Sequence, residues 1–268
     1  SSDNTGLKEL GEKLVFHFSD GDPIARPQRS PQSPSLALDT CGACHSRRSE
    51  LQEPSGTEPY HQRFQLEGLD EPLYFSDGQI REEVFVLGSF LQSKMAEAGV
   101  TCTNCHDPHT GKTLLPGAQV CGTCHAPTVF AAPEHTNGHE GADCLDCHMP
   151  ERIYMGVDAR RDHRFHRPSP KHPNSSAPCK TCHEDASEGW LTDALKAWPK
   201  RQGASPDTLG EWAALNQRLS ALDVTAVNAA SNLLNEDKLP SLEEAALVEK
   251  MVVITPQRML EKVSGMTD

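Results

Sequence analysis

The pattern of apolar and polar positions predicts little regular structure in the first two thirds of the chain and several helices in the last third. Residues 14–18 alternate with the period of a strand and lead into the turn-forming residues 19–22, which predicts a small β-hairpin. Apolar side chains recur at helical spacing over residues 79–98. We therefore expect a helix there that Asp77 caps and Gly99 ends.

From residue 187 onward Ala, Leu and Glu dominate, and the pattern predicts a series of helices. We expect them over residues 187–198, from Ser205 to about residue 222, over residues 223–235, from a capping box at Ser241, and from Thr255. Antiparallel helix pairs of this kind resemble the units of an α-solenoid. Two pairs are too few for a free array, so we expect them to dock on the preceding domain.

Residues 102–183 lack a regular apolar period but hold most copies of a repeated motif, Cys-x-x-Cys-His. The motif occurs five times and uses all ten cysteines, Cys41, Cys44, Cys102, Cys105, Cys121, Cys124, Cys144, Cys147, Cys179 and Cys182. Its histidines are His45, His106, His125, His148 and His183. In c-type cytochromes two such thiols bond covalently to haem, and the adjacent histidine becomes the proximal ligand of the iron. The sequence therefore predicts five covalently bound haem c groups.

Zinc and disulfides are the alternatives for these cysteines. The pairs Cys102 and Cys105, and Cys121 and Cys124, have the spacing of a zinc ribbon. A zinc site, however, needs no histidine directly after the second cysteine of each pair. Chance would place one after all five pairs with odds on the order of 10⁻⁷. Disulfides and redox dithiols fail the same test, so haem attachment is favoured.

Each iron also needs a ligand on its other face, the distal ligand, and histidines outside the motifs are the first candidates. We rank them in the order His109, His163, His135, His139 and His61, and interpret His17, His166 and His172 as spare. His109 is so close to His106 that it cannot reach the far face of the same porphyrin, so it should bind a neighbouring haem. His163 follows Asp162, a carboxylate that could orient its ring. Haems with two histidine ligands would have low potentials.

Composition and charge indicate how these haems are packed, which partners are excluded and where the protein is located. Aromatic residues make up only 5% of the chain, and five porphyrins would supply the large flat apolar surfaces that are missing. The formal net charge of −13 argues against nucleic acid as a partner. No apolar run is long enough for a transmembrane helix. Because haem is attached outside the cytoplasm, we interpret Ser1 as the start of a mature, exported chain and expect a periplasmic or extracellular location.

Several segments resemble one family. They read Cys-Gly-Ala-Cys-His-Ser-Arg-Arg from residue 41, Leu-Tyr-Phe-Ser-Asp-Gly-Gln-Ile from 73, Gly-Ser-Phe-Leu-Gln-Ser-Lys-Met from 88, Cys-Thr-Asn-Cys-His-Asp-Pro-His from 102, Cys-His-Met-Pro from 147 and Tyr-Met-Gly-Val-Asp-Ala-Arg-Arg-Asp-His from 154. Over most of residues 10–250 the chain is similar to the multihaem cytochromes c that are often fused to tetratricopeptide or HEAT-like repeats. That group is related to the pentahaem nitrite reductases, the hydroxylamine oxidoreductases and the tetrahaem cytochromes of ammonia oxidation. The resemblance implies that His109 and His163 act as distal ligands.

The chain departs from this group in two respects. Longer members carry additional haem motifs upstream of the one at Cys41, so the chain resembles their C-terminal five-haem portion, and the resemblance implies that the other haems belong to a partner subunit or to a removed segment. The pentahaem nitrite reductases attach their catalytic haem through Cys-x-x-Cys-Lys, and the sequence contains no such motif.

Taken together, the sequence predicts a mainly α fold with much irregular structure. We divide it into an N-terminal hairpin and linker (1–38), a five-haem cytochrome c domain organised by covalent haems (39–186) and a C-terminal helical-hairpin, α-solenoid-like domain (187–268).

The leading function is an exported pentahaem cytochrome that conducts electrons between redox partner proteins, with no catalytic residue. Other multihaem subunits are candidate partners, in a hetero-complex or a self-assembled filament. The alternative is an oxidoreductase that acts on a small nitrogen or sulfur compound at one open haem. Its substrate would need a basic pocket, for which the available cations are Arg160, Arg161, Arg164, Arg167 and Lys171.

Overall fold

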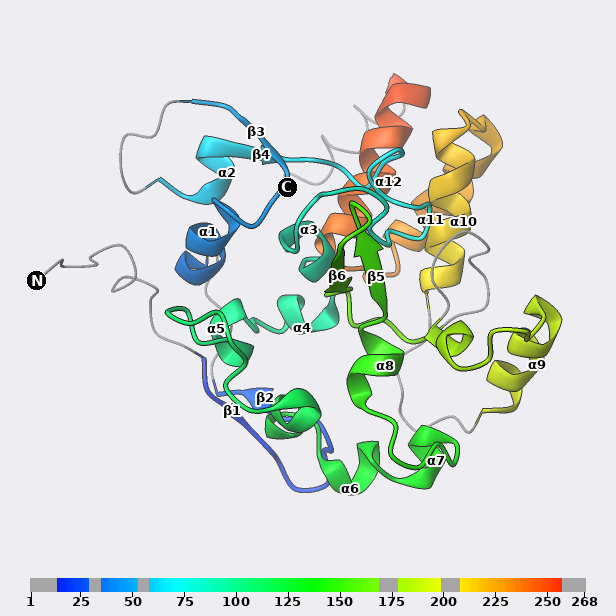
Figure 1. Ribbon diagram of the computed structural model, residues 1–268. Helices are drawn as coiled ribbons and strands as arrows, with labels where there is room; N and C mark the ends of the chain where they lie inside the picture. Colours follow the sequence, from blue (N-terminus) through cyan, green and yellow to red (C-terminus); the bar gives the residue numbers. More distant parts are fainter. Residues whose placement is uncertain (1–13, 29–34, 53–57, 169–177, 199–207, 257–268) are drawn as a thin grey trace, which may run out of the picture.

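The computed structural model describes residues 14–28, 35–52, 58–168, 178–198 and 208–256 (Figure 1). The first part contains β1 (Phe16–His17), β2 (Arg26–Pro27), α1 (Leu36–Gly42), β3 (Arg48–Glu50), α2 (Tyr60–Arg63), β4 (Phe64–Leu66), α3 (Leu87–Phe90) and α4 (Lys94–Glu97). The middle part contains α5 (Cys102–Cys105), η2 (Gly117–Thr123), α6 (Pro127–Phe130), α7 (Pro133–Thr136), α8 (Cys144–His148), β5 (Glu151–Tyr154), β6 (Asp158–Arg161) and η3 (Pro178–Thr181). The last part is helical, with α9 (Glu188–Ala197), α10 (Leu209–Ser220), η4 (Val224–Ala226), α11 (Val227–Leu234) and α12 (Ser241–Ile254).

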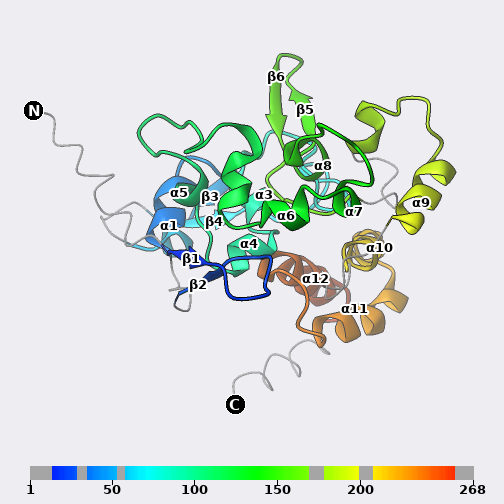
Figure 2. The ribbon, with the colours of Figure 1, turned by 90° about the horizontal axis from the view of Figure 1, so that it is seen from below.

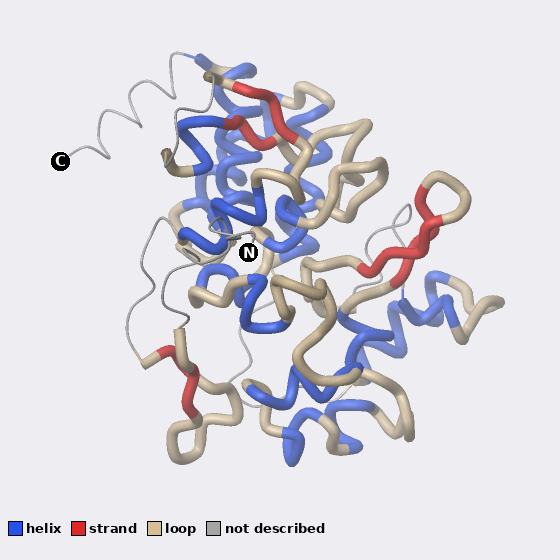
Figure 3. The backbone as a smooth tube through the Cα atoms, turned by 60° about the vertical axis from the view of Figure 1, so that its left-hand side comes forward, coloured by secondary structure: helices blue, strands red, loops and turns tan. Residues whose placement is uncertain are grey.

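The described strands form three separate antiparallel pairs, β1 with β2, β3 with β4 and β5 with β6. Figure 3 shows these pairs in different parts of the molecule. The β1–β2 pair confirms the hairpin expected near the N-terminus. The pairs β3–β4 and β5–β6 were not expected from the sequence. Seen from below, β5 and β6 project from the side opposite α11 and α12 (Figure 2).

The main hydrophobic core lies where α10, α11 and α12 pack on an irregular segment of the first half of the chain. Trp212 and Leu247 have no exposed surface, and Leu69, Tyr74 and Val84 from the earlier segment belong to the same cluster. Burial of one large apolar side chain stabilises a fold by about 1.5–3 kcal/mol. The helices of the last third therefore hold the loop segment in place rather than forming a core of their own.

The single helix expected over residues 79–98 does not form. Two four-residue helices, α3 and α4, occupy part of this range, and residues 79–86 run as an irregular loop. The apolar positions are buried as expected, but Ile80 and Val84 join the α10–α12 core whereas Leu87 joins a separate cluster around α2. Because these side chains face two different clusters, one continuous helix could not bury them all.

Where the described residues allow a comparison, the helices of the last third agree with the sequence pattern except at the N-terminus of α12. Ser187 caps α9 by accepting the Trp190 N–H at 3.1 Å, as expected, and Asp223 caps η4, which continues directly into α11. The expected start of the second helix, residues 205–207, lies outside the described residues, and so does most of the helix expected from Thr255.

Ser241 is not the N-cap of α12, because Pro240 takes that position. The Ser241 hydroxyl instead donates to Glu97 Oε1 at 2.9 Å, which ties α12 to α4. Within the described part of the chain, no helix has the length and apolar content needed to cross a membrane.

Candidate haem-binding motifs

Each cysteine motif forms a single helical turn. The backbone N–H of the motif histidine donates to the carbonyl of the first cysteine at 2.8 Å in the first, second and fifth motifs and at 2.9 Å in the third, and the fourth motif is the helix α8 itself. Cysteines three positions apart in a helical turn share one face. Both thiols of a motif therefore point to the same side, which attachment to one porphyrin edge requires.

Local side chains explain why these short turns form. Asn104 Oδ1 accepts the backbone N–H of Thr101 at 2.9 Å at the start of α5. At the start of α8, Asp143 accepts the N–H of Leu145 at 3.0 Å and Asp146 accepts that of Asp143 at 3.3 Å. Such caps satisfy N–H groups that a first turn leaves without partners.

The five motifs follow one another in space in the order of the chain. Helix α1 of the first motif packs against α5 of the second, and α8 of the fourth packs against both η2 of the third and η3 of the fifth. The second motif meets the third through Cys105, which lies near Cys121. Figures 1 and 2 both show α1 and α9, which follows the fifth motif, at opposite sides of the molecule.

Thiol pKa values reflect the same neighbourhood. A hydrogen bond between the Cys41 and Cys102 thiols lowers the pKa of Cys41 to about 7 and raises that of Cys102. Burial, followed by the neighbouring Cys144 and Cys105 thiols, raises the pKa of Cys121 to about 11. Cysteines of consecutive motifs thus lie close enough to perturb one another.

No disulfide joins any two of the ten cysteines. Among the residues that the structure describes, no cluster of three or more His, Cys, Asp or Glu side chains is arranged to hold a metal ion, which a zinc ribbon would require.

The rings of three histidines from outside the motifs lie near the rings of motif histidines, two of them stacked and one edge-on. The ring centroids of His163 and His106 lie 6.4 Å apart, those of His135 and His148 lie 6.0 Å apart, and those of His139 and His183 lie 6.1 Å apart. Two imidazoles on opposite sides of one metal ion, each with a metal–nitrogen bond of about 2.0 Å, have centroids roughly 6.3 Å apart. The three pairs thus have the separation that a shared iron would need.

Backbone carbonyls orient four of these rings. Nδ1 of His106 lies 3.1 Å from the Gly111 carbonyl oxygen, and Nδ1 of His139 lies 2.8 Å from that of Thr136. For His148 and His163 the corresponding distances to the His166 and Arg161 carbonyls are 3.0 Å and 2.9 Å. A ring that donates Nδ1–H to a carbonyl leaves Nε2 as the metal ligand, which is the arrangement usual for metal-bound histidine. Burial also lowers the pKa of both His148 and His163, which favours the neutral, ligating imidazole.

The other ranked histidines have no such partner. Within the described residues, neither His109 nor His61 makes a ring contact with a motif histidine, and His61 instead packs edge-on against Tyr60. Helix α2, which carries His61, packs against α1 of the first motif. These contacts do not test the distal roles of His109 and His61, which stay predictions.

His17 lies exposed in β1, and His172 lies outside the described residues.

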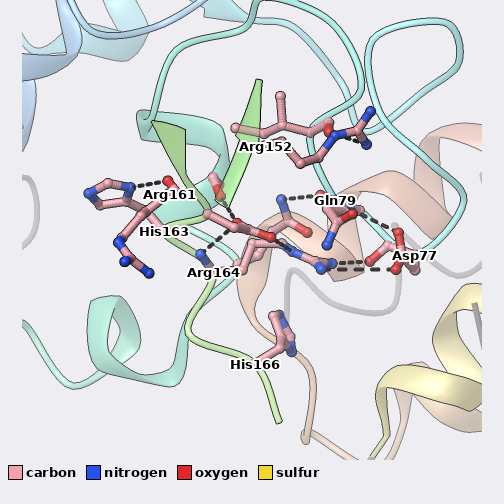
Figure 4. Close-up of polar contacts among 12 residues, drawn as sticks. Asp77, Gln79, Arg152, Arg161, His163, Arg164 and His166 are labelled. Carbon is pink, nitrogen blue, oxygen red and sulfur yellow. Dashed lines mark hydrogen bonds and ion pairs between the residues drawn. The ribbon is translucent and has the colours of Figure 1, made fainter. Parts of the chain in front are cut away.

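A buried ion-pair network holds residues 162–166, the strap that carries His163 (Figure 4). Arg164 has 5% of its side chain exposed and donates from Nε to Asp162 at 2.9 Å and from Nη1 to the Asp77 carbonyl. Asp162 accepts the Ser89 hydroxyl at 2.5 Å. Asp77, expected as a helix cap, instead lies 3.9 Å from the Arg164 guanidinium through its carboxylate.

The strap reaches two motifs. His163 at one end faces His106 of the second motif, and the carbonyl of His166 at the other end accepts a hydrogen bond from His148 of the fourth. The His166 ring also lies 3.4 Å from Glu243, a buried carboxylate on α12. His166 was interpreted as a spare ligand, and its backbone carbonyl has a structural role that the residue type does not reveal.

Three of the arginines that the alternative function would need for a basic pocket pair with carboxylates. Arg160 pairs with Glu83 and Asp158, Arg161 lies 3.6 Å from Asp146 and 3.9 Å from Glu151, and Arg164 is buried in the network above. Arg167 lies near His148, and Lys171 is outside the described residues. Three of the five available cations thus have carboxylate partners.

Comparisons with known families cover the middle and the later part of the chain. The cytochrome c552 family matches residues 129–242, and the doubled CXXCH motif matches residues 94–130. Neither the search of curated proteins nor that of solved structures gave a match. The first match contains the fourth and fifth motifs, and the second contains the second and third. These matches, together with the Cys-x-x-Cys-His motifs, support a multihaem c-type cytochrome with covalent haem c.

Proposed function

We propose that this protein is an exported electron carrier with five haem c groups, which passes electrons between redox partner proteins or other multihaem subunits. The observation that supports this proposal best is the set of three imidazole pairs at 6.0–6.4 Å, since a haem with two histidine ligands has no open position for a substrate. The consecutive contact of the motifs adds a continuous series of sites from one side of the molecule to the other.

The geometry supports a ligand assignment for three sites. His163 would serve the second motif, His135 the fourth and His139 the fifth. For the first and third motifs we propose His61 and His109. His61 is the candidate for the first motif because α2 packs against α1. The family resemblance supports a distal role for His109.

When bound, haem supplies one-electron redox chemistry at its iron. The chain's own residues do the rest. The thiols and motif histidines would hold each group, the carbonyls of Gly111, Thr136, Arg161 and His166 orient the rings, and burial lowers the pKa of His148 and of His163. Axial ligands and burial are the features through which a protein sets haem potentials.

Carbon monoxide binding to the fully reduced holoprotein tests this function. We expect no haem to bind it, because every iron would already have two protein ligands. The optical spectrum, titrated against total haem, gives the stoichiometry. Binding at one haem in five would contradict the electron-carrier proposal for that site.

The haem count has its own test. We expect the intact mass of the denatured protein to include five haems, and the double variant Cys144→Ala/Cys147→Ala to lose one of them. A Thr123→Ser variant, which changes a motif residue that bonds no haem, is the matched control and should keep all five. An unchanged haem count in the double variant would refute attachment at the fourth motif.

A second candidate function is an oxidoreductase, because the matched cytochrome c552 family is linked to nitrite reductase. The paired arginines and the lack of a Cys-x-x-Cys-Lys motif weigh against it in this chain. Consumption of nitrite or hydroxylamine by the reduced holoprotein, measured against the same protein with its haems saturated by carbon monoxide, would favour this second function.

A further inference from the structure

One tryptophan contacts both histidines that face the fourth and fifth motifs. Trp198 directly follows α9, and its indole Nε1–H donates to the His135 carbonyl at 2.9 Å. Its ring stacks on His139, with centroids 5.7 Å apart and an angle of 7° between the planes. These contacts join residues about sixty positions apart in the chain, so they are tertiary and not local.

His135 and His139 belong to one tight turn. Helix α7 ends at Thr136, Asn137 adopts the left-handed conformation with φ of 52°, and His139 turns back so that its Nδ1 meets the Thr136 carbonyl. The two rings leave this turn in different directions, one toward His148 and the other toward His183. A contact that holds the turn of residues 135–139 in place therefore also positions the rings of His135 and His139.

Helix α9 spans the fifth site from one side to the other. At its start Trp190 lies against the motif histidine His183, with centroids 4.9 Å apart, and beyond its end Trp198 lies against His139. Leu191, only 4% exposed, anchors the helix between them. The position of Trp198 is thus set by a helix that is itself packed.

We propose that Trp198 is a positioning residue for the distal ligands of the fourth and fifth haems, and that it holds His135 through a hydrogen bond and His139 through stacking. This inference rests on the proposed function, since it takes both histidines as iron ligands. One side chain outside the motifs would then keep two irons six-coordinate.

The test uses reduced holoprotein with carbon monoxide and oxidised holoprotein by electron paramagnetic resonance. We expect Trp198→Ala to bind carbon monoxide at one or two haems per chain. In Trp198→Phe, stacking on His139 remains and only the hydrogen bond is lost, so we expect the low-spin signal of the fourth haem to shift while that of the fifth stays. Unchanged signals and stoichiometry in both variants would overturn the proposal.

Two sets of controls separate this inference from the ligand assignment. His135→Ala and His139→Ala should each open one haem to carbon monoxide, and if neither does, the assignment itself fails. If both do but Trp198→Ala behaves as the wild type, only the role of Trp198 fails. Lys196→Ala changes an exposed side chain of the same helix without touching residues 135–139 or His183, and should leave every haem six-coordinate. Opening of the same two haems in Lys196→Ala would show general loosening of α9 and refute a specific role for Trp198.

Discussion

Replacing Arg164 with Met is expected to lower the free energy of unfolding by about 3–5 kcal/mol, the usual cost of removing one partner from a buried ion pair. Asp162 and Asp77 are buried beside the guanidinium, and the substitution would leave both carboxylates without their counter-ion. For a chain of this size such a loss corresponds to a fall in the melting temperature of roughly 6–20 °C. Circular dichroism of the holoprotein during heating measures it.

Arg160 provides the matched control, since it is an arginine of the same hairpin region with two carboxylate partners but a side chain that is 32% exposed. Arg160→Met should cost about 0–1 kcal/mol, as solvent screens a partly exposed pair. A triple variant that also carries Asp162→Asn and Asp77→Asn removes the buried charges together and should recover part of the loss. Equal effects of Arg164→Met and Arg160→Met would contradict a buried role for Arg164.

His163→Ala is expected to open the second haem site to carbon monoxide, so that one haem in five binds the gas in the reduced holoprotein. His163 has the separation from His106 that a shared iron requires, its Nδ1 is held by the Arg161 carbonyl, and burial lowers its pKa. His163→Met retains a sixth ligand, and because methionine ligation raises haem potentials, it should shift one midpoint potential upward without opening the site. Spectroelectrochemical titration measures that shift.

His17→Ala is the control for this experiment, because His17 lies exposed on β1 and is not among the ranked ligands. It should change neither the stoichiometry of carbon monoxide nor any potential. If His163→Ala binds no more carbon monoxide than His17→Ala, the pairing of His163 with the second motif is wrong. The ligand set would then have to include another residue at that site.

The strap of residues 162–166 has two roles. Arg164 and Asp162 are structural, and His163 between them would be an iron ligand. The strap is joined to the helical layer because Glu243 of α12 lies beside His166 and contributes to the electrostatic stabilisation of Arg164. The helices of the last third thereby support the haem region, although they contain no cysteine or histidine after residue 187.

The sequence by itself was enough to locate the haem motifs and most helices of the last third. Haem attachment depends on two thiols and a histidine at fixed local spacing, so five consecutive residues contain all the information. Ser187 and Asp223 also act locally, as caps of the turns that follow them. Features of this kind need no knowledge of distant parts of the chain.

Only the tertiary structure decided which histidine faces which motif and where the apolar positions of residues 79–98 are buried. His163 lies near His106 because the β5–β6 hairpin reverses the chain direction. Arg164 then donates a hydrogen bond to the carbonyl of Asp77, a residue far away in sequence. Ile80 and Leu87 look alike as a helical stripe, but they pack into different clusters. Periodicity records that a side chain is buried and not what it packs against, so contacts between distant segments could not be predicted from it.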